Sequence, residues 1–253
     1  MKLLLDLGNT RLKWAWQSGS GDWLARGAVD WSDADVAAVL AAAWAGLPRP
    51  GQVVAASVVD DAREAKVAAV VAQLHAGAPT WLRTPAQACG VLNAYAEPQR
   101  LGVDRFLAMV AAHADVRSAC VLAGVGTALT LDALTADGRH LGGLIAPGPQ
   151  LMRQSLLGAT AQVRPERPGD VRDLADNTAD AVASGCWQAA VALIERFVAR
   201  VTPQLDGSPV LVLGGGDAPA LLPLLSLPAR LSEDSVLRGL SIWADTLPVA
   251  SDV

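Results

Sequence analysis

An acidic residue, a glycine-containing turn and a lysine follow one another near the start of the chain. Asp6 ends a short hydrophobic run, the segment Gly8-Asn9-Thr10 follows it, and Lys13 lies three residues further on. A carboxylate held at a strand end can orient a hydrated Mg²⁺, and the amides of a glycine turn can cradle phosphate oxygens. Lys13 would add a point charge to the phosphates. The pattern predicts a site for Mg²⁺ and a nucleoside phosphate, although ordinary hairpin turns also favour glycine and asparagine.

Two more glycine-rich turns adjoin hydrophobic runs in the second half of the chain. Gly126-Thr127 precedes a run that contains Asp132, and Gly214-Gly215-Gly216 follows a β-branched run. Two turns facing each other would grip a triphosphate from both sides, and bare glycine backbone can lie against a nucleobase or ribose. Each turn taken alone is as typical of a plain connection between elements. The chain has no Walker-type lysine loop, which excludes the P-loop kinases.

The segment from Leu101 opens a predicted helix with an acid and an arginine side by side. Asp104 is placed to accept the proton of a substrate alcohol that attacks the γ-phosphate, and Arg105 to fix the substrate or balance charge. Tyr95, the only tyrosine, lies in the preceding loop beside Asn93, where a ring can pack on an aliphatic substrate. The plainer explanations are the preference of aspartate for helix starts and a surface tyrosine. The segment is a candidate catalytic site that these residues alone do not establish.

The histidines and cysteines show no spacing typical of a metal site or a catalytic triad. No carboxylate or cysteine accompanies any histidine at such a spacing, and the serines lack a nucleophile-elbow context. Three cysteines far apart in the sequence fit reduced cytosolic thiols better than a disulfide framework. These residues are His75, His113 and His140, and Cys89, Cys120 and Cys186.

The hydrophobic pattern predicts strands and helices arranged twice in a similar way. Strands are expected at 2–6, 12–17, 23–29, 52–58 and 80–83, and helices at 33–45, 60–75 and 101–114. The second half has predicted strands at 118–123, 128–134, 139–145 and 210–213, and helices at 150–157, 177–200, 218–225 and 234–246. Each half opens with a hairpin whose turn carries glycine and threonine. The sequence therefore predicts α/β layers in two domains, 1–115 and 116–253.

The composition predicts a globular, cytoplasmic protein. Of the 253 residues, 52% are hydrophobic and 18% are charged, which supplies material for buried sheets and argues against disorder. The net charge of −5 gives no reason to expect a nucleic-acid or anionic-membrane surface. No apolar run reaches the ~18 residues that span a bilayer, and the start MKLLLDLGNT meets an acid too early for a secretory signal. No nucleic-acid partner and no membrane partner are expected.

Taken together, these motifs resemble the type III pantothenate kinases, members of the acetate-kinase, sugar-kinase and actin superfamily. The first and second phosphate motifs of that family are similar to DLGNTRLK at 6–13 and GTALTLD at 126–132. Its pantothenate-binding stretch is similar to LNAYAEPQRLGVDRF at 92–106, and two further blocks to GGLIAPGPQLMRQSL at 142–156 and NTADAVASG at 177–185. The resemblance implies two actin-like (ribonuclease H-like) domains, each a mixed sheet with flanking helices, with an ATP cleft between them.

The resemblance also implies a reaction and the residues that carry it. The reaction would be ATP-dependent phosphorylation of pantothenate to 4′-phosphopantothenate, the first step of coenzyme A biosynthesis, with Mg²⁺ held by Asp6 directly or through water. The proton acceptor would be Asp104, and pantothenate contacts would be Tyr95, Gly102, Val103, Asp104, Arg105 and Thr178. ATP binding would fall on Thr127 and on the consecutive residues Asp6, Leu7, Gly8, Asn9, Thr10, Arg11, Leu12 and Lys13. Family members are homodimers with substrate sites near the subunit interface, so a homodimer is expected.

One position departs from the family pattern. Many members carry an aspartate two residues before the Gly-Thr of the second phosphate motif, where it binds a monovalent cation, K⁺ or NH₄⁺; here that position is Gly124. The departure weakens the expectation of a cation site and leaves the predicted fold unaffected. Two other functions stay open: a non-catalytic regulatory relative that affects transcription, and an actin-like kinase for another small alcohol. The retained Asp6, Asp104, Arg105 and Thr127 favour an enzyme.

Overall fold

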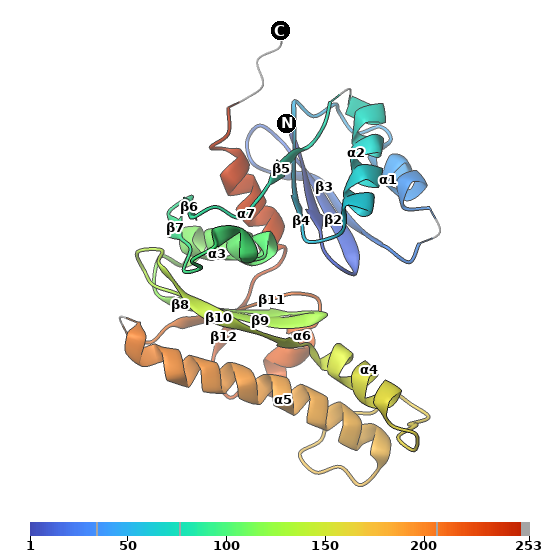
Figure 1. The fold of residues 1–253 in the computed structure, drawn as a ribbon, viewed down its shortest axis with the longest axis vertical. Helices are drawn as coiled ribbons and strands as arrows, with labels where there is room; N and C mark the ends of the chain where they lie inside the picture. Colours follow the sequence, from blue (N-terminus) through green and yellow to red (C-terminus); the bar gives the residue numbers. More distant parts are fainter. Residues whose placement is uncertain (34, 76, 206, 249–253) are drawn as a thin grey trace. The chain divides into compact units, whose positions relative to one another are not determined.

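The computed structural model describes residues 1–33, 35–75, 77–205 and 207–248, which form two compact units (Figure 1). The first unit comprises Met1–Ala111 and the described residues from Ser235 onward, and the second comprises Ala112–Asp234. Each unit is built on a five-stranded mixed sheet.

The sheet of the first unit has the strand order β3-β2-β1-β4-β5. The strands are β1 (Lys2–Leu7), β2 (Arg11–Gln17), β3 (Trp23–Asp30), β4 (Gln52–Ser57) and β5 (Thr80–Leu82). The first three strands form an antiparallel meander, and β4 and β5 join it in parallel. Parallel neighbours need crossover connections, which are supplied here by α1 (Val36–Trp44) and α2 (Asp61–His75).

Side chains of this sheet alternate between two buried faces, which explains the almost continuous apolar run of β1. One face, the tryptophan core, gathers Leu3, Leu5, Leu7, Trp14 and Trp16 of the sheet with residues of α1 and α2. The opposite face carries Leu4, Ala15, Val54 and Ala56. It packs against Val103 and Leu107 of α3 (Val103–Val116) and Leu237, Leu240 and Ala244 of α7 (Ser235–Ala244), and we call it the α3–α7 face.

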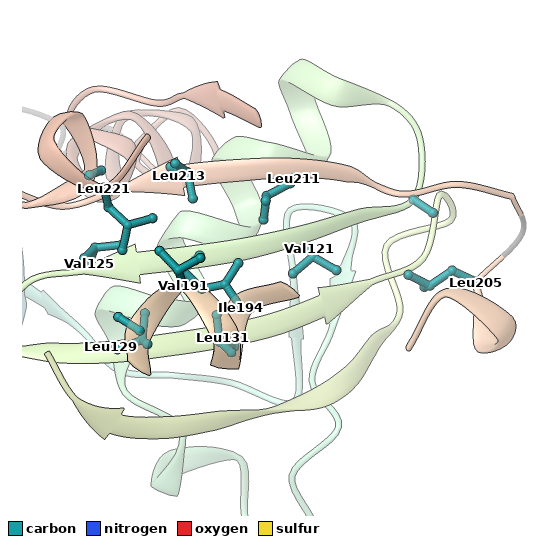
Figure 2. Close-up of a cluster of buried hydrophobic side chains, with 14 residues drawn as sticks. Val121, Val125, Leu129, Leu131, Val191, Ile194, Leu205, Leu211, Leu213 and Leu221 are labelled. Carbon is teal, nitrogen blue, oxygen red and sulfur yellow. The ribbon is translucent and has the colours of Figure 1, made fainter. Parts of the chain in front are cut away.

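The second unit repeats the topology with the order β10-β9-β8-β11-β12 and the same pattern of antiparallel and parallel pairs. Its strands are β8 (Cys120–Val125), β9 (Ala128–Leu134), β10 (His140–Pro147), β11 (Val210–Gly214) and β12 (Ala229–Leu231). Figure 2 shows its core, where Val121, Leu129 and Leu131 of the sheet meet Val191 and Ile194. The predicted α/β class with two mixed sheets is confirmed.

The long helix of the second unit, α5 (Thr178–Val201), supplies the last two of those core residues and packs beside α4 (Pro149–Ala159). Within the described chain, the segment Thr178–Gln204 is the one helix whose length and apolar composition would suffice to span a membrane. However, 44% of its most apolar window is buried inside the protein. Its buried side, which includes Ala190, Val191 and Ile194, packs in the core of the second unit.

Short elements complete the described chain. The loop after β5 holds a two-stranded ribbon, β6 (Gln87–Ala88) and β7 (Val91–Leu92), and the 3₁₀ turn η1 (Pro98–Arg100). The second unit adds η2 (Thr202–Gln204), α6 (Ala218–Leu221) and η3 (Leu222–Leu224).

The C-terminal helix does not follow the predicted domain division, which gave residues 116–253 to one domain. In the structure, α7 belongs to the first unit. A Cβ placed on Gly239 would lie 2.0 Å from the backbone oxygen of Leu107, so α7 and α3 are in backbone contact. The buried Ser241 hydroxyl donates to Gln17 Oε1 over 2.8 Å, and Lys2 forms an ion pair with Asp245. Helical periodicity shows that α7 has an apolar side but not which sheet receives it.

Candidate functional site

The turn between β1 and β2 is tight and places two charged side chains on one face. The Gly8 amide donates to the Arg11 carbonyl over 3.1 Å, and a Cβ on Gly8 would lie 3.2 Å from the same oxygen. The strand register pairs Asp6 with Lys13, and directly opposed residues project on the same side of a sheet. Because Asp6 alternates with Leu5 and Leu7, it lies on the α3–α7 face, where it is 9% exposed.

The helix that carries the predicted general base packs against this same face. Val103 belongs to the core of the α3–α7 face, so Asp104 stands in the first turn of a helix anchored there. One Asp104 oxygen, Oδ1, accepts the Arg105 backbone N–H over 2.8 Å. A Cβ on Gly102 would lie 2.5 Å from Oδ1. Glycine at position 102 therefore leaves the space that the carboxylate occupies.

Arg105 and Tyr95, two predicted pantothenate contacts, are brought together in the first unit. Arg105 Nη1 donates to Tyr95 Oη over 3.1 Å, and the guanidinium carbon lies 5.9 Å from the centroid of the tyrosine ring. Arg105 is only 6% exposed, so a positive charge is held in a largely buried position beside a half-buried aromatic ring. This arrangement suits a substrate with both an anionic group and an aliphatic part.

The loop that presents Tyr95 is braced by buried polar side chains. Asn93 donates to the carbonyls of Pro85 and Pro98, over 3.3 and 3.2 Å, and its own oxygen accepts the Tyr95 amide over 3.0 Å. Thr84 Oγ1 ties the beginning of the loop to its end by donating to the Leu101 carbonyl over 2.7 Å. The sequence pointed to Asn93 only as a neighbour of Tyr95, and Thr84 was missed because a bond to a distant carbonyl leaves no local pattern.

In the second unit, three backbone segments meet at the Gly126-Thr127 turn. The Gly148 amide donates to the Thr127 carbonyl over 2.9 Å, and a Cβ on Gly148 would lie 1.9 Å from the Gly126 oxygen. Gly215 has a positive φ of 93°, and a Cβ there would lie 2.2 Å from the Val125 oxygen. The predicted glycine turns at 126–127 and 214–216 are thus neighbours. The sequence did not single out Gly148, which precedes the first residue of α4.

Thr178, the remaining predicted substrate contact, is the exposed first residue of α5 in the second unit. It lines an open pocket together with Leu156, Val163, Asp176, Ala181 and Val182.

A buried acid holds the loop before α5 in place. Asp180 accepts the Asp170 amide over 2.9 Å, the Asn177 side chain over 2.9 Å and Arg167 Nη2 over 2.6 Å. The Asp170 N–H, the Asn177 side chain and the Arg167 guanidinium hold the pKa of Asp180 below its usual range. The loop beside Thr178 is therefore tied to the helix start through one carboxylate.

One histidine has a carboxylate partner that the sequence analysis did not single out. His140 Nε2 lies 2.9 Å from Asp132 Oδ1, and the residues are 2% and 3% exposed. They lie on the adjacent antiparallel strands β10 and β9, next to a register shift between His140 and Gly142. The register of this hairpin could have predicted that the side chains of His140 and Asp132 lie close together.

The described residues contain no cluster of three or more histidine, cysteine, aspartate or glutamate side chains able to hold a metal ion. All three cysteines are unpaired, as expected for reduced thiols. Burial raises the pKa of Cys120 to about 12, which keeps this thiol protonated and unreactive at neutral pH.

Gly124, the position that departs from the family pattern, faces a threonine. Its cross-strand partner is Thr130, and a Cβ on Gly124 would lie 2.6 Å from Thr130 Oγ1. A neutral hydroxyl therefore occupies the space into which a side chain at position 124 would project.

Two comparisons of the sequence with known proteins point to the same family. The family model described as type III pantothenate kinase matches residues 2–200. The type III pantothenate kinase of Aromatoleum aromaticum is 40% identical over 247 residues, which cover 96% of this chain and 98% of that protein.

Two solved structures resemble the fold, each covering 96% of this chain and 98% of the other. One, from Campylobacter jejuni, is described as a Baf-family transcriptional activator, with a TM-score of 0.61 and 16% identity. The other, from Sinorhizobium meliloti, is described as a 2-dehydro-3-deoxygalactonokinase, with a TM-score of 0.61 and 15% identity. At these identities the likeness shows the fold alone. The family model and the close relative show more: this chain is a member of the type III pantothenate kinase family.

Proposed function

We propose that this protein transfers the γ-phosphoryl group of ATP to pantothenate, giving ADP and 4′-phosphopantothenate. Membership in a family of kinases makes the chain an enzyme. The observation that carries the choice of acceptor is the pairing of the buried Arg105 with the half-buried Tyr95 beside Asp104, inside the stretch that resembles the family's pantothenate-binding segment. Pantothenate is a carboxylate with an aliphatic body and a primary alcohol, and these groups match a guanidinium, an aromatic ring and a proton acceptor in turn.

Asp104 is the proposed general base. As the substrate oxygen attacks the γ-phosphorus, Asp104 takes the hydroxyl proton, the bond from phosphorus to the β-phosphate bridging oxygen breaks, and ADP leaves with that electron pair. The Arg105 amide, 2.8 Å from Oδ1, holds the carboxylate in one orientation. Arg105 itself attracts the substrate carboxylate, and Gly102 and Val103 complete the contact at the helix start.

ATP binding is proposed for residues 6–13 and for Thr127. Asp6 is a suitable Mg²⁺ ligand, directly or through water, because it is a hard oxygen donor fixed at the end of a buried strand. Bound Mg²⁺ would neutralise charge on the phosphates. Lys13, the cross-strand partner of Asp6, adds a positive charge on the same side of the sheet.

The test of this function is the release of ADP from purified protein, Mg²⁺ and ATP with a panel of small alcohols. We expect turnover with pantothenate and none with sugars. Turnover with a sugar alone would identify a kinase for another alcohol. Absence of turnover with every alcohol, in protein that is folded, would favour the regulatory alternative.

We further propose a cytoplasmic homodimer in which the second unit supplies the interface. Large apolar side chains are exposed on β10, on α4 and in the loop before α5: Leu144, Ile145, Leu156 and Leu174. Leu156 shares the open pocket with Thr178, so a second copy seated there would bring Thr178 to the subunit boundary. A cytoplasmic location agrees with unpaired thiols and with coenzyme A biosynthesis.

We expect Leu156→Asp to shift the protein from dimer to monomer, because a charge would be buried in the interface. Sedimentation at several concentrations measures the change. Leu231→Asp is a matched control, since Leu231 is exposed to a similar degree, 45% against 40%, but lies on β12 at the other edge of the sheet. A wild-type monomer at all concentrations would contradict the proposal.

Turnover should not depend on K⁺, because position 124 lacks the carboxylate that would bind it. One charge at contact distance is worth on the order of a few kcal/mol even in a partly solvated site. We expect equal rates in K⁺, Na⁺ and Tris buffers. Gly124→Asp should gain K⁺ activation as Thr130 turns aside, whereas Gly124→Ala adds the same Cβ without the charge and should not. Strong activation of the unmodified protein at low millimolar K⁺ would contradict this prediction.

A further inference from the structure

We infer that Trp31, which lies outside every motif described above, is a positioning residue for the first phosphate turn. This inference rests on the proposed binding of ATP by residues 6–13. Trp31 follows directly after β3 and donates two hydrogen bonds to the turn. Its indole Nε1 donates to the Gly8 carbonyl over 2.6 Å, and its backbone amide donates to the Thr10 carbonyl over 3.1 Å. The two bonds lie on either side of Asn9.

These bonds fix the direction in which the turn presents its amides. In a trans peptide, the carbonyl and the following N–H point in opposite directions. Because the Gly8 carbonyl is held toward the indole, the N–H of Asn9 points away from Trp31. A phosphate is bound by N–H groups and repelled by carbonyl oxygens, so the orientation of this peptide decides whether the turn attracts or rejects an anion. Without the indole bond, glycine at position 8 would let the peptide rotate more freely.

Trp31 is itself held from two sides. Its ring packs against the tryptophan core, and the guanidinium carbon of Arg63 lies 5.3 Å from the ring centroid. Arg63 is in the first turn of α2, where its backbone amide donates to Asp60 Oδ1 over 2.9 Å. The turn is therefore linked through one aromatic ring to the start of a helix. A rigid ring suits this task because it loses little conformational entropy while burying a large area.

The test is Trp31→Phe, which keeps a ring on the core and under Arg63 but removes the indole N–H. One neutral hydrogen bond corresponds to roughly three- to tenfold in binding. We expect the KM for ATP, and the Kd for MgATP measured by calorimetry, to rise by about that factor. The KM for pantothenate and kcat should change by less than about twofold. If Trp31 served only core packing, its replacement would lower the unfolding temperature but would not change the constants for ATP and for pantothenate by different factors.

Trp81→Phe is the matched control. Trp81 packs against the same core and carries a similarly placed arginine, with Arg83 at 5.7 Å from its ring centroid. It lies on β5, at the opposite edge of the sheet from β3, so its replacement should leave the ATP constants unchanged. Should Trp31→Phe fail to fold, Arg63→Met releases the ring without touching the turn and should raise the Kd for MgATP by a smaller factor.

Two results would overturn the inference. One is an unchanged Kd for MgATP in Trp31→Phe, and the other is a parallel rise in the constants for both substrates. Failure of the proposed function looks different, since the wild-type protein would then bind MgATP but not turn over pantothenate. In that case the calorimetric comparison still tests Trp31.

Discussion

Asp104→Asn is expected to lower kcat by about 10²–10⁴-fold while leaving MgATP binding and the fold unchanged, because an amide cannot take the proton of the attacking hydroxyl. Asparagine is similar in size, and its amide oxygen can still accept the Arg105 N–H that now meets Asp104 Oδ1 at 2.8 Å. The side chain should therefore keep its place beside Gly102 and lose only its basicity. Initial rates at saturating ATP and pantothenate, with calorimetry for MgATP, measure the effect.

Loss of an acid near a helix start also removes a favourable interaction with the helix dipole, typically 0.3–1 kcal/mol. Asp61→Asn controls for this, since Asp61 is an exposed acid in the first turn of α2. Asp61→Asn should lower the free energy of unfolding slightly and leave turnover unchanged. If Asp104→Asn keeps kcat within about tenfold of the wild type, Asp104 is not the general base. An equal loss of turnover in Asp104→Asn and Asp61→Asn would mean that the effect arises from helix stability.

The sequence identified the strands and helices well because each carries a strong local signal. The run KLLLDL is buried on both faces of the first sheet, and its almost continuous apolar pattern predicts a strand without reference to other segments. The long helix predicted at 177–200 is Thr178–Val201 in the structure, and its start is marked by the Asn177 cap that accepts the Asp180 amide. Helix caps, turns and periodicity each depend on a few neighbouring residues, so they can be recognised without knowing which segment packs against them.

What escaped prediction depends on contacts between segments distant in sequence. The placement of α7 rests on Gly239 meeting Leu107, and no periodicity reports which sheet a helix will cover. The indole bond from Trp31 to Gly8 spans 23 residues and the bond from Thr84 to Leu101 spans 17, so neither leaves a local pattern in the sequence. The assigned roles of Asp6, Asp104, Thr127 and Thr178 came from chemistry and family resemblance, and they remain predictions.

The second large effect is expected at Gly148, whose missing side chain lets the chain before α4 lie against the Gly126-Thr127 turn. A Cβ there would lie 1.9 Å from the Gly126 oxygen and 3.1 Å from the Thr127 oxygen, and backbone atoms cannot rotate aside as a side chain does. Gly148→Ala must therefore push α4 away from the Gly126-Thr127 turn and break the bond from the Gly148 amide to the Thr127 carbonyl. Overpacking of this kind costs about 1–3 kcal/mol of unfolding free energy.

The displaced turn carries Thr127, a proposed ATP contact, so Gly148→Ala should also raise the Kd for MgATP by more than about tenfold, since one lost charge-assisted contact alone accounts for such a factor. Urea unfolding and calorimetry measure the two effects. Gly158→Ala is the matched control in the same helix, because a Cβ there meets nothing within 4 Å. Alanine is the better helix former, so that variant should gain about 0.5–1 kcal/mol and keep its affinity for MgATP. A stable Gly148→Ala variant with normal MgATP binding would show that the turn tolerates displacement, and it would remove the argument that ties Thr127 to the nucleotide.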